Sequence, residues 1–273
     1  MPITTRFAPS PTGFLHLGHA FSAWNAKRRA DIFHLRLEDI DTTRCRAEYA
    51  AAIIEDLQWL GLNWDGDIRV QSEHLPEYQA ALDTLHGKNL LYPCFCTRAE
   101  IARAQSAPHG AEPVYPGTCR HISASERAMR IASGALYTMR LDMTAAAAQA
   151  GDLEFFEERT GWTTTTPERF GDVVLARRDI PTSYHLCVVH DDAAQNITHV
   201  IRGEDLRDAT HIHVLLQALL GLPTPIYAHH ALLTDATGKR LAKRDTAATL
   251  RGLRQSGVAA ATLLQRFEDM KTA

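Results

Sequence analysis

Residues 3 to 30 contain a strand, a loop and a helix in succession, and this unit constrains the fold more than any other part of the chain. Ile3 to Phe7 is apolar and β-prone, two prolines and Gly13 interrupt regular structure, and the residues after Gly18 have helical composition. Such a junction places backbone N–H groups and the positive end of a helix dipole at the edge of a sheet. It therefore predicts a phosphate-binding site within an α/β fold.

Two histidines three residues apart, His16 and His19, stand at the start of the predicted helix. Their imidazoles can stabilise charge that develops on a phosphate during a displacement reaction. They can equally well cap the helix on a surface loop. A His-x-x-His pair taken alone does not distinguish these two interpretations.

A second strand and a second helix follow directly. His34 to Glu38 has the pattern of a strand, and the acidic turn after it leads to a helix with Tyr49, Ile53 and Leu57 on one face. The alternation of strands and helices predicts a parallel sheet of the α/β class. Glu38 would lie at the carboxyl edge of that sheet, where ligands bind, although a salt bridge with Arg44 or a helix cap is the alternative.

Composition limits the function classes. Of 273 residues, 45% are hydrophobic and 22% are charged, which is typical of a globular protein with a substantial core. The net charge of −3 argues against broad, non-specific nucleic-acid binding. No apolar run approaches the roughly 20 residues that span a bilayer, and Met1 to Ser10 has no signal-peptide core. These features predict a cytoplasmic protein without a membrane partner.

Three of the five cysteines are crowded between Cys94 and Cys119. Their spacing indicates a metal site in a reducing compartment rather than a disulfide scaffold. Three thiolates and one further donor complete a tetrahedral zinc site, and a structural role is expected because four protein donors leave no position for water. Composition alone favours His109 or His121 as the fourth donor, because the tyrosine at position 115 is an uncommon type of zinc ligand. Three buried cysteines without a metal are the alternative.

Residue patterns predict the remaining elements less sharply. We expect helices at 124–132 and 211–220, an alanine-rich helix that ends at Ala150, and a helical tail at 246–270. We expect strands at 136–141 and after Asn196, a buried strand at 181–190, and an exposed strand or loop at 162–166.

The stretch from Arg6 to His19 resembles the nucleotide signature of class I aminoacyl-tRNA synthetases, in the form used by the glutamyl branch. His16-Leu17-Gly18-His19 stands where that class has His-Ile-Gly-His, and Arg6 to Gly13 is similar to the glutamate-binding lead-in of the family. Further similar motifs begin at Leu35, Tyr184 and Thr198, so that the resemblance covers nearly the whole chain.

The resemblance implies a glutamate pocket. Glu38 would hold the amino group of glutamate. Arg202 can bind the side-chain carboxylate through two charge-assisted hydrogen bonds, and it would reject glutamine because an amide leaves a buried cation poorly paired. The implied pocket residues are Arg6, Phe7, Ala8, Pro9, Ser10, Glu38, Tyr184 and Arg202.

The resemblance also implies an ATP site with bound Mg²⁺. Gly238 to Asp245 stands at the mobile signature loop of the family, but Arg240 replaces the first lysine and Ala242 replaces the serine. These departures bear on loop closure and turnover more than on ATP binding. The implied ATP-binding residues are His16, Gly18, His19, Gly203, Glu204, Arg240 and Lys243, of which His16, His19 and Lys243 would be catalytic.

The resemblance selects Tyr115 as the fourth zinc donor, beside Cys94, Cys96 and Cys119. It implies a Rossmann-type catalytic domain in two halves, 1–90 and 171–245, with an inserted α+β zinc-bearing acceptor-type subdomain at 91–170 and a short helical tail at 246–273. We expect no anticodon-binding domain, since too little chain follows the signature loop. The pair Arg177 and Arg178 is a candidate RNA contact, although exposed arginines usually form only a solvated surface.

The expected activity follows from the short paralogues of the glutamyl branch. They imply that ATP and L-glutamate form glutamyl-adenylate without tRNA, that glutamate then passes to queuosine in the anticodon loop of tRNA(Asp), and that the enzyme is a monomer. One alternative is a compact enzyme that charges the 3′ end of tRNA(Glu). The others are a non-catalytic glutamate- or RNA-binding module and a small nucleotidylyltransferase, which would explain the ATP site alone.

Overall fold

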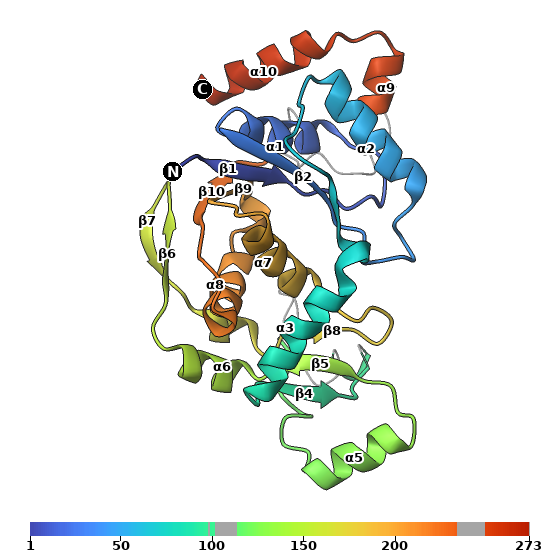
Figure 1. Cartoon of the computed structure of the whole chain (residues 1–273), viewed down its shortest axis with the longest axis vertical. Helices are drawn as coiled ribbons and strands as arrows, with labels where there is room; N and C mark the ends of the chain where they lie inside the picture. Colours follow the sequence, from blue (N-terminus) through green and yellow to red (C-terminus); the bar gives the residue numbers. More distant parts are fainter. Residues whose placement is uncertain (98, 102–113, 234–248, 273) are drawn as a thin grey trace.

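The computed structural model describes residues 1–97, 99–101, 114–233 and 249–272. The molecule is elongated, with a larger sheet in its upper half and a smaller sheet in its lower half (Figure 1). Helices α9 (Leu250–Gln255) and α10 (Ala260–Thr272) lie at one end, and α5 (Ala124–Ala132) lies at the other. None of the helices in these ranges is both long and apolar enough to cross a membrane.

The larger sheet is mainly parallel, as the alternation of strands and helices predicts. One group of parallel strands consists of β1 (Thr4–Phe7), β2 (Ile32–Leu37) and β3 (Arg69–Val70). A second group of parallel strands consists of β9 (His199–Gly203), β10 (Ile226–His230) and β6 (Glu154–Glu157). Strand β7 (Gly161–Thr164) pairs antiparallel with β6. The ladders form two sheets, one of three strands and one of four, and we describe them together as the larger sheet because they adjoin at β1 and β9. The Thr198 backbone N–H, just before β9, donates to the Thr4 carbonyl of β1 at 3.0 Å. The chain therefore runs outward in both directions from β1 and β9, which is the switch point where parallel sheets bind ligands.

Helices cover both faces of this sheet (Figure 1). One face packs against α1 (Leu17–Lys27) and α2 (Ala47–Trp59), through a core that includes Trp24, Phe33 and Leu35 and extends to Phe267 of α10. The other face packs against α8 (Ala209–Leu220) through Val200, Val214 and Tyr227. Successive side chains of β9 point to opposite faces, so Val200 belongs to one core and Ile201 to the other.

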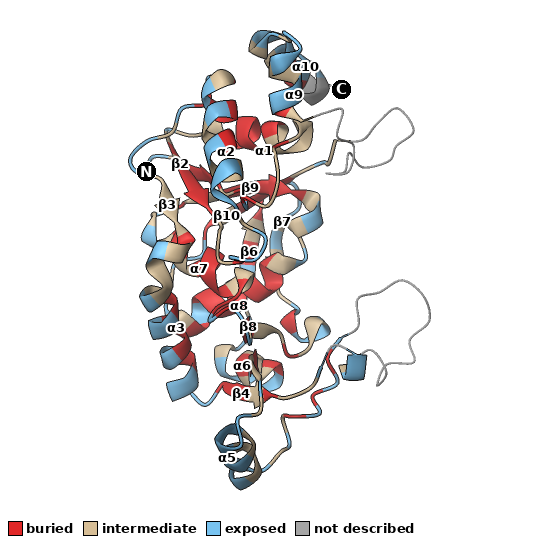
Figure 2. Cartoon of the chain, turned by 90° about the vertical axis from the view of Figure 1, so that its right-hand side faces the viewer, coloured by how far each residue is buried: buried red, intermediate tan, exposed pale blue. Residues whose placement is uncertain are grey.

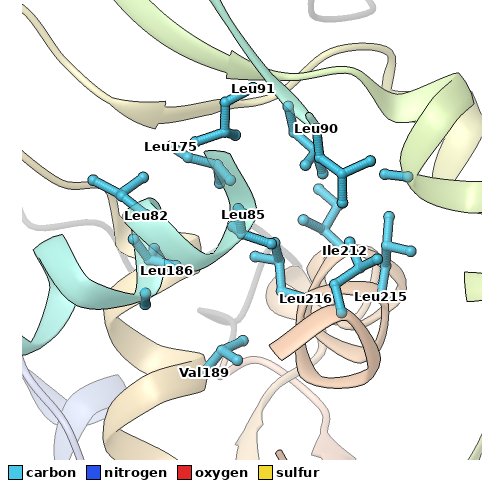
Figure 3. Close-up of a cluster of buried hydrophobic side chains, with 14 of the residues drawn as sticks. Leu82, Leu85, Leu90, Leu91, Leu175, Leu186, Val189, Ile212, Leu215 and Leu216 are labelled. Carbon is cyan, nitrogen blue, oxygen red and sulfur yellow. The ribbon is translucent and has the colours of Figure 1, made fainter. Parts of the chain in front are cut away.

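The lower half is built on an antiparallel sheet of β4 (Leu91–Cys94), β5 (Thr138–Leu141) and β8 (Val174–Ala176). It packs with α3 (Leu75–Gly87), α6 (Met143–Ala150), α7 (Tyr184–Ala194) and α8 around a single apolar core. In Figure 3, Leu85 from α3, Leu175 from β8 and Leu215 from α8 converge in this core. Short 3-10 helices lie at Gln71–His74, Pro167–Phe170 and Glu204–Leu206.

Burial follows the two sheets and their inner helices, whereas α5 has no buried residue (Figure 2). Three strands belong to a different half of the molecule from the one that the domain limits proposed from the sequence would give them. The β6–β7 hairpin comes before residue 170 but pairs with β10 in the larger sheet, and β8 comes after it but pairs with β5 in the smaller sheet. The division at residues 90, 170 and 245 remains a proposal.

The prediction of a buried strand at 181–190 is wrong. These residues form a turn followed by the helix α7, which begins at Tyr184 after Ser183. Leu186, Cys187, Val188 and Val189 are all buried, so the helix has no polar face over this run and loses the period of an amphipathic helix. A short apolar run of this kind cannot be assigned to a strand or a helix from periodicity alone. The predicted tail forms two helices, α9 and α10, rather than one.

Candidate active site

The first strand, loop and helix have the arrangement that the sequence predicts. Strand β1 ends at Phe7, the loop crosses the carboxyl edge of the sheet, and α1 begins at Leu17. The loop is tied to β2, since the backbone N–H of Glu38 donates to the carbonyl of Pro9 at 3.0 Å. The start of α1 therefore lies beside the end of β2.

His16 and His19 do cap the helix. Nδ1 of His16 accepts from the backbone N–H of Gly18 at 3.0 Å, and Nδ1 of His19 accepts from the backbone N–H of His16 at 3.2 Å. Each neutral imidazole has one acceptor nitrogen and one donor nitrogen, so these bonds place the ring hydrogen on Nε2. Their ring centroids are 3.8 Å apart. Capping and pocket lining are combined here, because both side chains also face the cavity described next.

A cavity of about 560 Å³ opens at the switch point. It brings together residues from β1, the loop, α1, the end of β2, the start of α7 and the end of β9. Of the residues proposed from the sequence, its walls contain Arg6, Phe7, Ala8, Pro9, Ser10, His16, Gly18, His19, Glu38, Tyr184, Arg202 and Gly203. Residues separated by almost 200 positions in the chain thus share one pocket.

One proposed residue of the described part of the chain is not part of this wall. Glu204 is not among the residues that line the cavity, and its carboxylate forms an ion pair with Arg207 at 2.8 Å. Arg240 and Lys243 lie outside the described residues. Gly18 has little room for a side chain, since a Cβ there would lie 2.9 Å from Cε1 of His16.

Glu38 stands at the boundary of the pocket and a buried ion network. Burial raises the pKa of Glu38 to about 7, although the nearby Arg36 and Arg6 act to lower it. Nη2 of Arg36 lies 3.5 Å from the Glu38 carboxylate. The charge of Glu38 is therefore less stable here than in water, and a cationic ligand would restore it.

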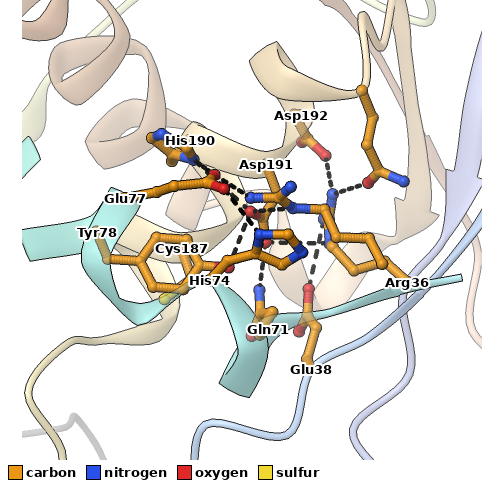
Figure 4. Close-up of polar contacts among 12 residues, drawn as sticks. Arg36, Glu38, Gln71, His74, Glu77, Tyr78, Cys187, His190, Asp191 and Asp192 are labelled. Carbon is orange, nitrogen blue, oxygen red and sulfur yellow. Dashed lines mark hydrogen bonds and ion pairs between the residues drawn. The ribbon is translucent and has the colours of Figure 1, made fainter.

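The network behind Glu38 was not predicted from the sequence. Arg36, which is fully buried, lies 2.8 Å from Asp192 and 3.7 Å from Asp191 (Figure 4). Asp192 also accepts from Nε of Arg6 at 2.8 Å, and Asp191 accepts from Arg69 at 2.8 Å. Interaction with the imidazole of His190, together with the charges of Arg36 and Arg69, holds the pKa of Asp191 at about 2 despite its burial. Two adjacent carboxylates of α7 thus hold arginines from β1, β2 and β3.

Arg202 has a different environment. Its side chain is buried, and its guanidinium donates to His229, His213 and Thr210, with donor–acceptor distances of 3.1, 3.2 and 2.7 Å. Tyr184 lies near this group, with its ring centroid 5.7 Å from that of His213, and burial raises the pKa of its phenol. The sequence analysis did not identify His213 or His229. Each belongs to a histidine cluster that follows Arg202 in the chain, His211-Ile-His213 and His229-His230.

A second cavity of about 770 Å³ adjoins the first, and both are lined by Ser10, Glu38 and Tyr184. Its far wall comes from the smaller sheet and the cysteine-rich segment, through Cys96, Thr138 and Arg140. Four arginines line this cavity: Arg44, Arg140, Arg177 and Arg178. Three carboxylates, those of Glu38, Asp41 and Asp179, line it as well, so the wall carries only a small excess of positive charge. The cavity lies between the two halves of the molecule.

The cysteine cluster forms as predicted. The Sγ atoms of Cys94, Cys96 and Cys119 lie within 4.8 Å of one another, and those of Cys96 and Cys119 are 3.5 Å apart. Sulfurs around a tetrahedral zinc ion are about 3.8 Å apart, given Zn–S bonds of about 2.3 Å. The Tyr115 hydroxyl lies 3.7 Å from Sγ of Cys96. This group can hold a metal ion, and Arg178 connects it to the second cavity by donating to the carbonyls of Phe95 and Cys96 at 3.0 Å.

Comparison with known proteins gives one family. Residues 2–268 match the model of the tRNA synthetases class I (E and Q), catalytic domain. A protein of Rhodobacter capsulatus named glutamyl-Q tRNA(Asp) synthetase is 49% identical, over 95% of this chain and 97% of that protein. A protein of the same name from Symbiobacterium thermophilum is 42% identical, over 95% of this chain and 83% of that protein.

Solved structures agree with this result. A glutamate tRNA ligase from Elizabethkingia meningosepticum, whose crystal structure contains its amino acid, superposes with a TM-score of 0.74 at 28% identity and covers 89% of this chain. The chain spans about half the length of that ligase, since 52% of it is matched. The family resemblance inferred from the motifs is confirmed. The chain belongs to the class I tRNA synthetases of the glutamate and glutamine type, and it is an ATP-dependent ligase with the mixed α/β catalytic domain of that family.

Proposed function

We propose that this chain activates L-glutamate with ATP to form glutamyl-adenylate without tRNA, and that it then transfers glutamate to queuosine in the anticodon loop of tRNA(Asp). The observation that carries the proposal is the single pocket that contains Glu38, Arg6 and Arg202 together with His16 and His19. An amino-acid site and a phosphate site must adjoin in this way for a carboxylate to reach a nucleotide.

In this proposal the amino acid is held at both ends. The carboxylate of Glu38 binds the ammonium group of glutamate, and the guanidinium of Arg202 binds its side-chain carboxylate. Phe7 to Ser10 and Tyr184 complete the pocket wall. Arg6 faces the same space, and its orientation is fixed by Asp192.

The nucleotide would lie against the start of α1. The Nε2–H groups of His16 and His19 and the positive end of the α1 dipole stabilise negative charge on the phosphates. Gly203 closes the opposite wall. Arg240, Lys243 and Glu204 are proposed to contribute from the resemblance alone. Mg²⁺ bound with ATP would neutralise further phosphate charge.

The first reaction is a displacement in which the α-carboxylate of glutamate attacks the α-phosphorus of ATP and pyrophosphate leaves. The enzyme positions the reactants and stabilises charge, with no covalent enzyme intermediate. In the second reaction a hydroxyl of the queuosine cyclopentenediol attacks the carbonyl of the adenylate, an ester forms and AMP leaves. The arginine-lined cavity that shares Glu38 and Tyr184 with the glutamate pocket is the proposed entry for this acceptor.

The queuosine assignment rests on the names of the relatives that the chain matches over most of their length. We further propose that Cys94, Cys96, Tyr115 and Cys119 hold one structural zinc ion, which would fix the wall of the acceptor cavity. The expectation of a cytoplasmic monomer remains a prediction.

The test is exchange of labelled pyrophosphate into ATP, measured with the purified chain and without RNA. We expect efficient exchange with glutamate and no more than trace exchange with glutamine, followed by transfer of labelled glutamate to tRNA(Asp) that contains queuosine but not to tRNA(Asp) that lacks it. Exchange that appears only after addition of tRNA(Glu) would instead identify an enzyme that charges the 3′ end. Absence of exchange under both conditions would contradict the proposal and favour a binding module.

A further inference from the structure

The partners of Arg202 differ in charge from those of the other arginine of the pocket. Arg6 is paired with the carboxylate of Asp192 at 2.8 Å. Arg202, with only 5% of its surface exposed, donates to two imidazoles and one hydroxyl, and it forms no ion pair with an Asp or Glu of the described part of the chain. A buried cation without a counter-charge is costly, so an anionic ligand has a strong reason to bind beside it.

The first imidazole is held as an acceptor by a carboxylate behind it. Nδ1 of His229 lies 2.5 Å from Oε2 of Glu157, and the other oxygen of Glu157 accepts from the backbone N–H of His229 at 3.2 Å. The ring hydrogen is thereby placed on Nδ1, and Nε2 presents its lone pair to Nε of Arg202 at 3.1 Å. Burial, together with the charge of Arg202, lowers the pKa of His229 to about 3, so the ring is neutral. Glu157 is therefore separated from Arg202 by a neutral ring.

The second imidazole, His213, is likewise held as an acceptor toward Arg202, in this case by the imidazole of His185. Nδ1 of His213 lies 3.2 Å from Nη1 of Arg202, and its Nε2 lies 3.1 Å from Nδ1 of His185. Accepting from Arg202 requires that His213 donate to His185 through Nε2–H. Burial is also the main cause that lowers the pKa values of both rings, to about 4 for His185. The chain of rings thus stays uncharged at neutral pH.

The hydroxyl of Thr210 accepts from Nη2 of Arg202 at 2.7 Å and lies 3.4 Å from Nε2 of His229. The three partners together use one hydrogen of each guanidinium nitrogen. A guanidinium has five N–H groups, so Nη1 and Nη2 each retain one donor. Arg202 lines the glutamate pocket, and two donors on adjacent nitrogens match the two oxygens of a carboxylate.

We propose that Thr210, His213 and His229 are specificity-determining residues, which select a substrate carboxylate over the corresponding amide by leaving the charge of Arg202 uncompensated. The neutral shell orients the guanidinium without neutralising it, and the side-chain carboxylate of the substrate becomes its counter-ion. An amide brings two oxygen lone pairs but no charge, and its NH₂ group faces a donor. This inference rests on the proposed binding of glutamate in this pocket and adds the residues that decide between acid and amide.

The test replaces one neutral partner by a carboxylate. Thr210 is fully buried and is the second residue of α8, so the helix dipole and the adjacent guanidinium of Arg202 both favour the carboxylate that Thr210→Asp introduces. Thr210→Asn is the matched control, because the asparagine side chain has nearly the same shape as aspartate but carries no charge. Pyrophosphate exchange without RNA gives kcat/KM for glutamate and for glutamine in each variant.

We expect the glutamate-to-glutamine ratio of kcat/KM to fall on the order of 100-fold in Thr210→Asp, mainly through a higher KM for glutamate. In Thr210→Asn, both substrates should lose activity alike, so that the ratio stays within about threefold of the wild type. The KM for ATP should be unchanged in both variants, which separates a local charge effect from misfolding. A Thr210→Asp enzyme that discriminates like the wild type would overturn the inference, and so would an equal collapse of the ratio in Thr210→Asn.

A second pair, His213→Glu and His213→Gln, repeats the comparison at another partner should Thr210→Asp fail to fold. Calorimetric titration with glutamate and glutamine separates this inference from the proposed activity. A wild-type chain that binds glutamate, and loses this preference in Thr210→Asp, supports the inference even if no exchange occurs. A wild-type chain that binds neither amino acid would contradict it.

Discussion

At the scale of single residues, several side chains of the pocket have both a structural and a proposed chemical role. His16 and His19 cap α1 through Nδ1, and this same bonding directs the donor hydrogen to Nε2. Glu38 belongs to the buried ion network and to the pocket wall. Its raised pKa follows from this double position, because burial penalises the carboxylate before a cationic substrate arrives.

Glu38 should make glutamate binding depend on pH. Its pKa of about 7 means that the carboxyl is increasingly protonated below that pH, and a protonated carboxyl does not attract an ammonium group. We expect kcat/KM for glutamate, measured by exchange at saturating ATP, to fall as the pH decreases through about 7, approaching tenfold per pH unit.

The control for this prediction is Glu38→Gln, which keeps the shape of the side chain and has no proton to exchange. Its activity should be far lower at every pH, and the inflection near neutrality should be absent. If the variant retains the inflection, another group controls the profile.

At the scale of elements, α7 connects the pocket to the sheet. Tyr184 at its first turn lines both cavities, and Asp191 and Asp192 at its last turn hold Arg6, Arg36 and Arg69 from three strands. The position of Arg6 in the pocket therefore depends on a helix that comes about 180 residues later in the chain. Three arginines would otherwise be buried or half-buried without sufficient counter-charge.

Asp192→Asn should destabilise the fold strongly. The substitution keeps the shape but removes the carboxylate charge that Arg6 and Arg36 share, both of which are buried. Removing one partner of a buried ion pair costs on the order of 3 kcal/mol. We therefore expect the free energy of unfolding, measured by urea denaturation, to decrease by about this amount.

Asp83→Asn is the matched comparison, since the carboxylate of Asp83 is exposed and its hydrogen-bond partner within the described residues is Gln79 on the same helix. Its effect should stay within about 0.5 kcal/mol. Equal stabilities of the Asp192 and Asp83 variants would show that the network contributes no net stability through charge.

At the scale of the whole molecule, two sheets with separate cores form the two halves, and the arginine-lined cavity lies between them. The cysteine segment has its own small core of Tyr92, Cys94, Tyr115 and Cys119. A core of this size gives the segment little folding stability by itself. A bound metal ion would add the stability that apolar burial does not supply.

A metal ion should therefore copurify with the chain and stabilise this segment. We expect about one zinc ion per chain by elemental analysis and its loss in Cys96→Ser, with a lower melting temperature. Cys45→Ser is the control for metal content, because Cys45 lies outside the cluster. Tyr115→Phe and His121→Ala together identify the fourth donor.

A chain that purifies without metal, and whose melting temperature does not change on chelation, would contradict the zinc proposal. If Tyr115→Phe retains the full metal content while His121→Ala loses it, the cluster binds metal but the donor chosen from the resemblance is wrong.

The amino-acid sequence by itself determined the local parts of this protein. The first strand, loop and helix, a parallel sheet, the close cysteines and the candidates His16, His19 and Glu38 follow from short-range patterns, in which proline, glycine, capping residues and ligand spacing act within a few residues of each other. The family motifs identified Arg6 to Ser10 and Gly18 as pocket residues. The family motifs added Tyr184 and Arg202, which lie far from Glu38 in the chain but line the same cavity.

Only the tertiary structure decided what surrounds the charges. Buried α7 shows no amphipathic period. No spacing in the sequence reveals that Asp192 meets Arg6 and Arg36, or that the partners of Arg202 are two neutral imidazoles and a hydroxyl. Such contacts join strands and helices distant in sequence, and burial sets the strength of each charge through desolvation. A sequence lists ionisable groups, whereas their pairing and protonation depend on the low-dielectric environment that the completed fold creates.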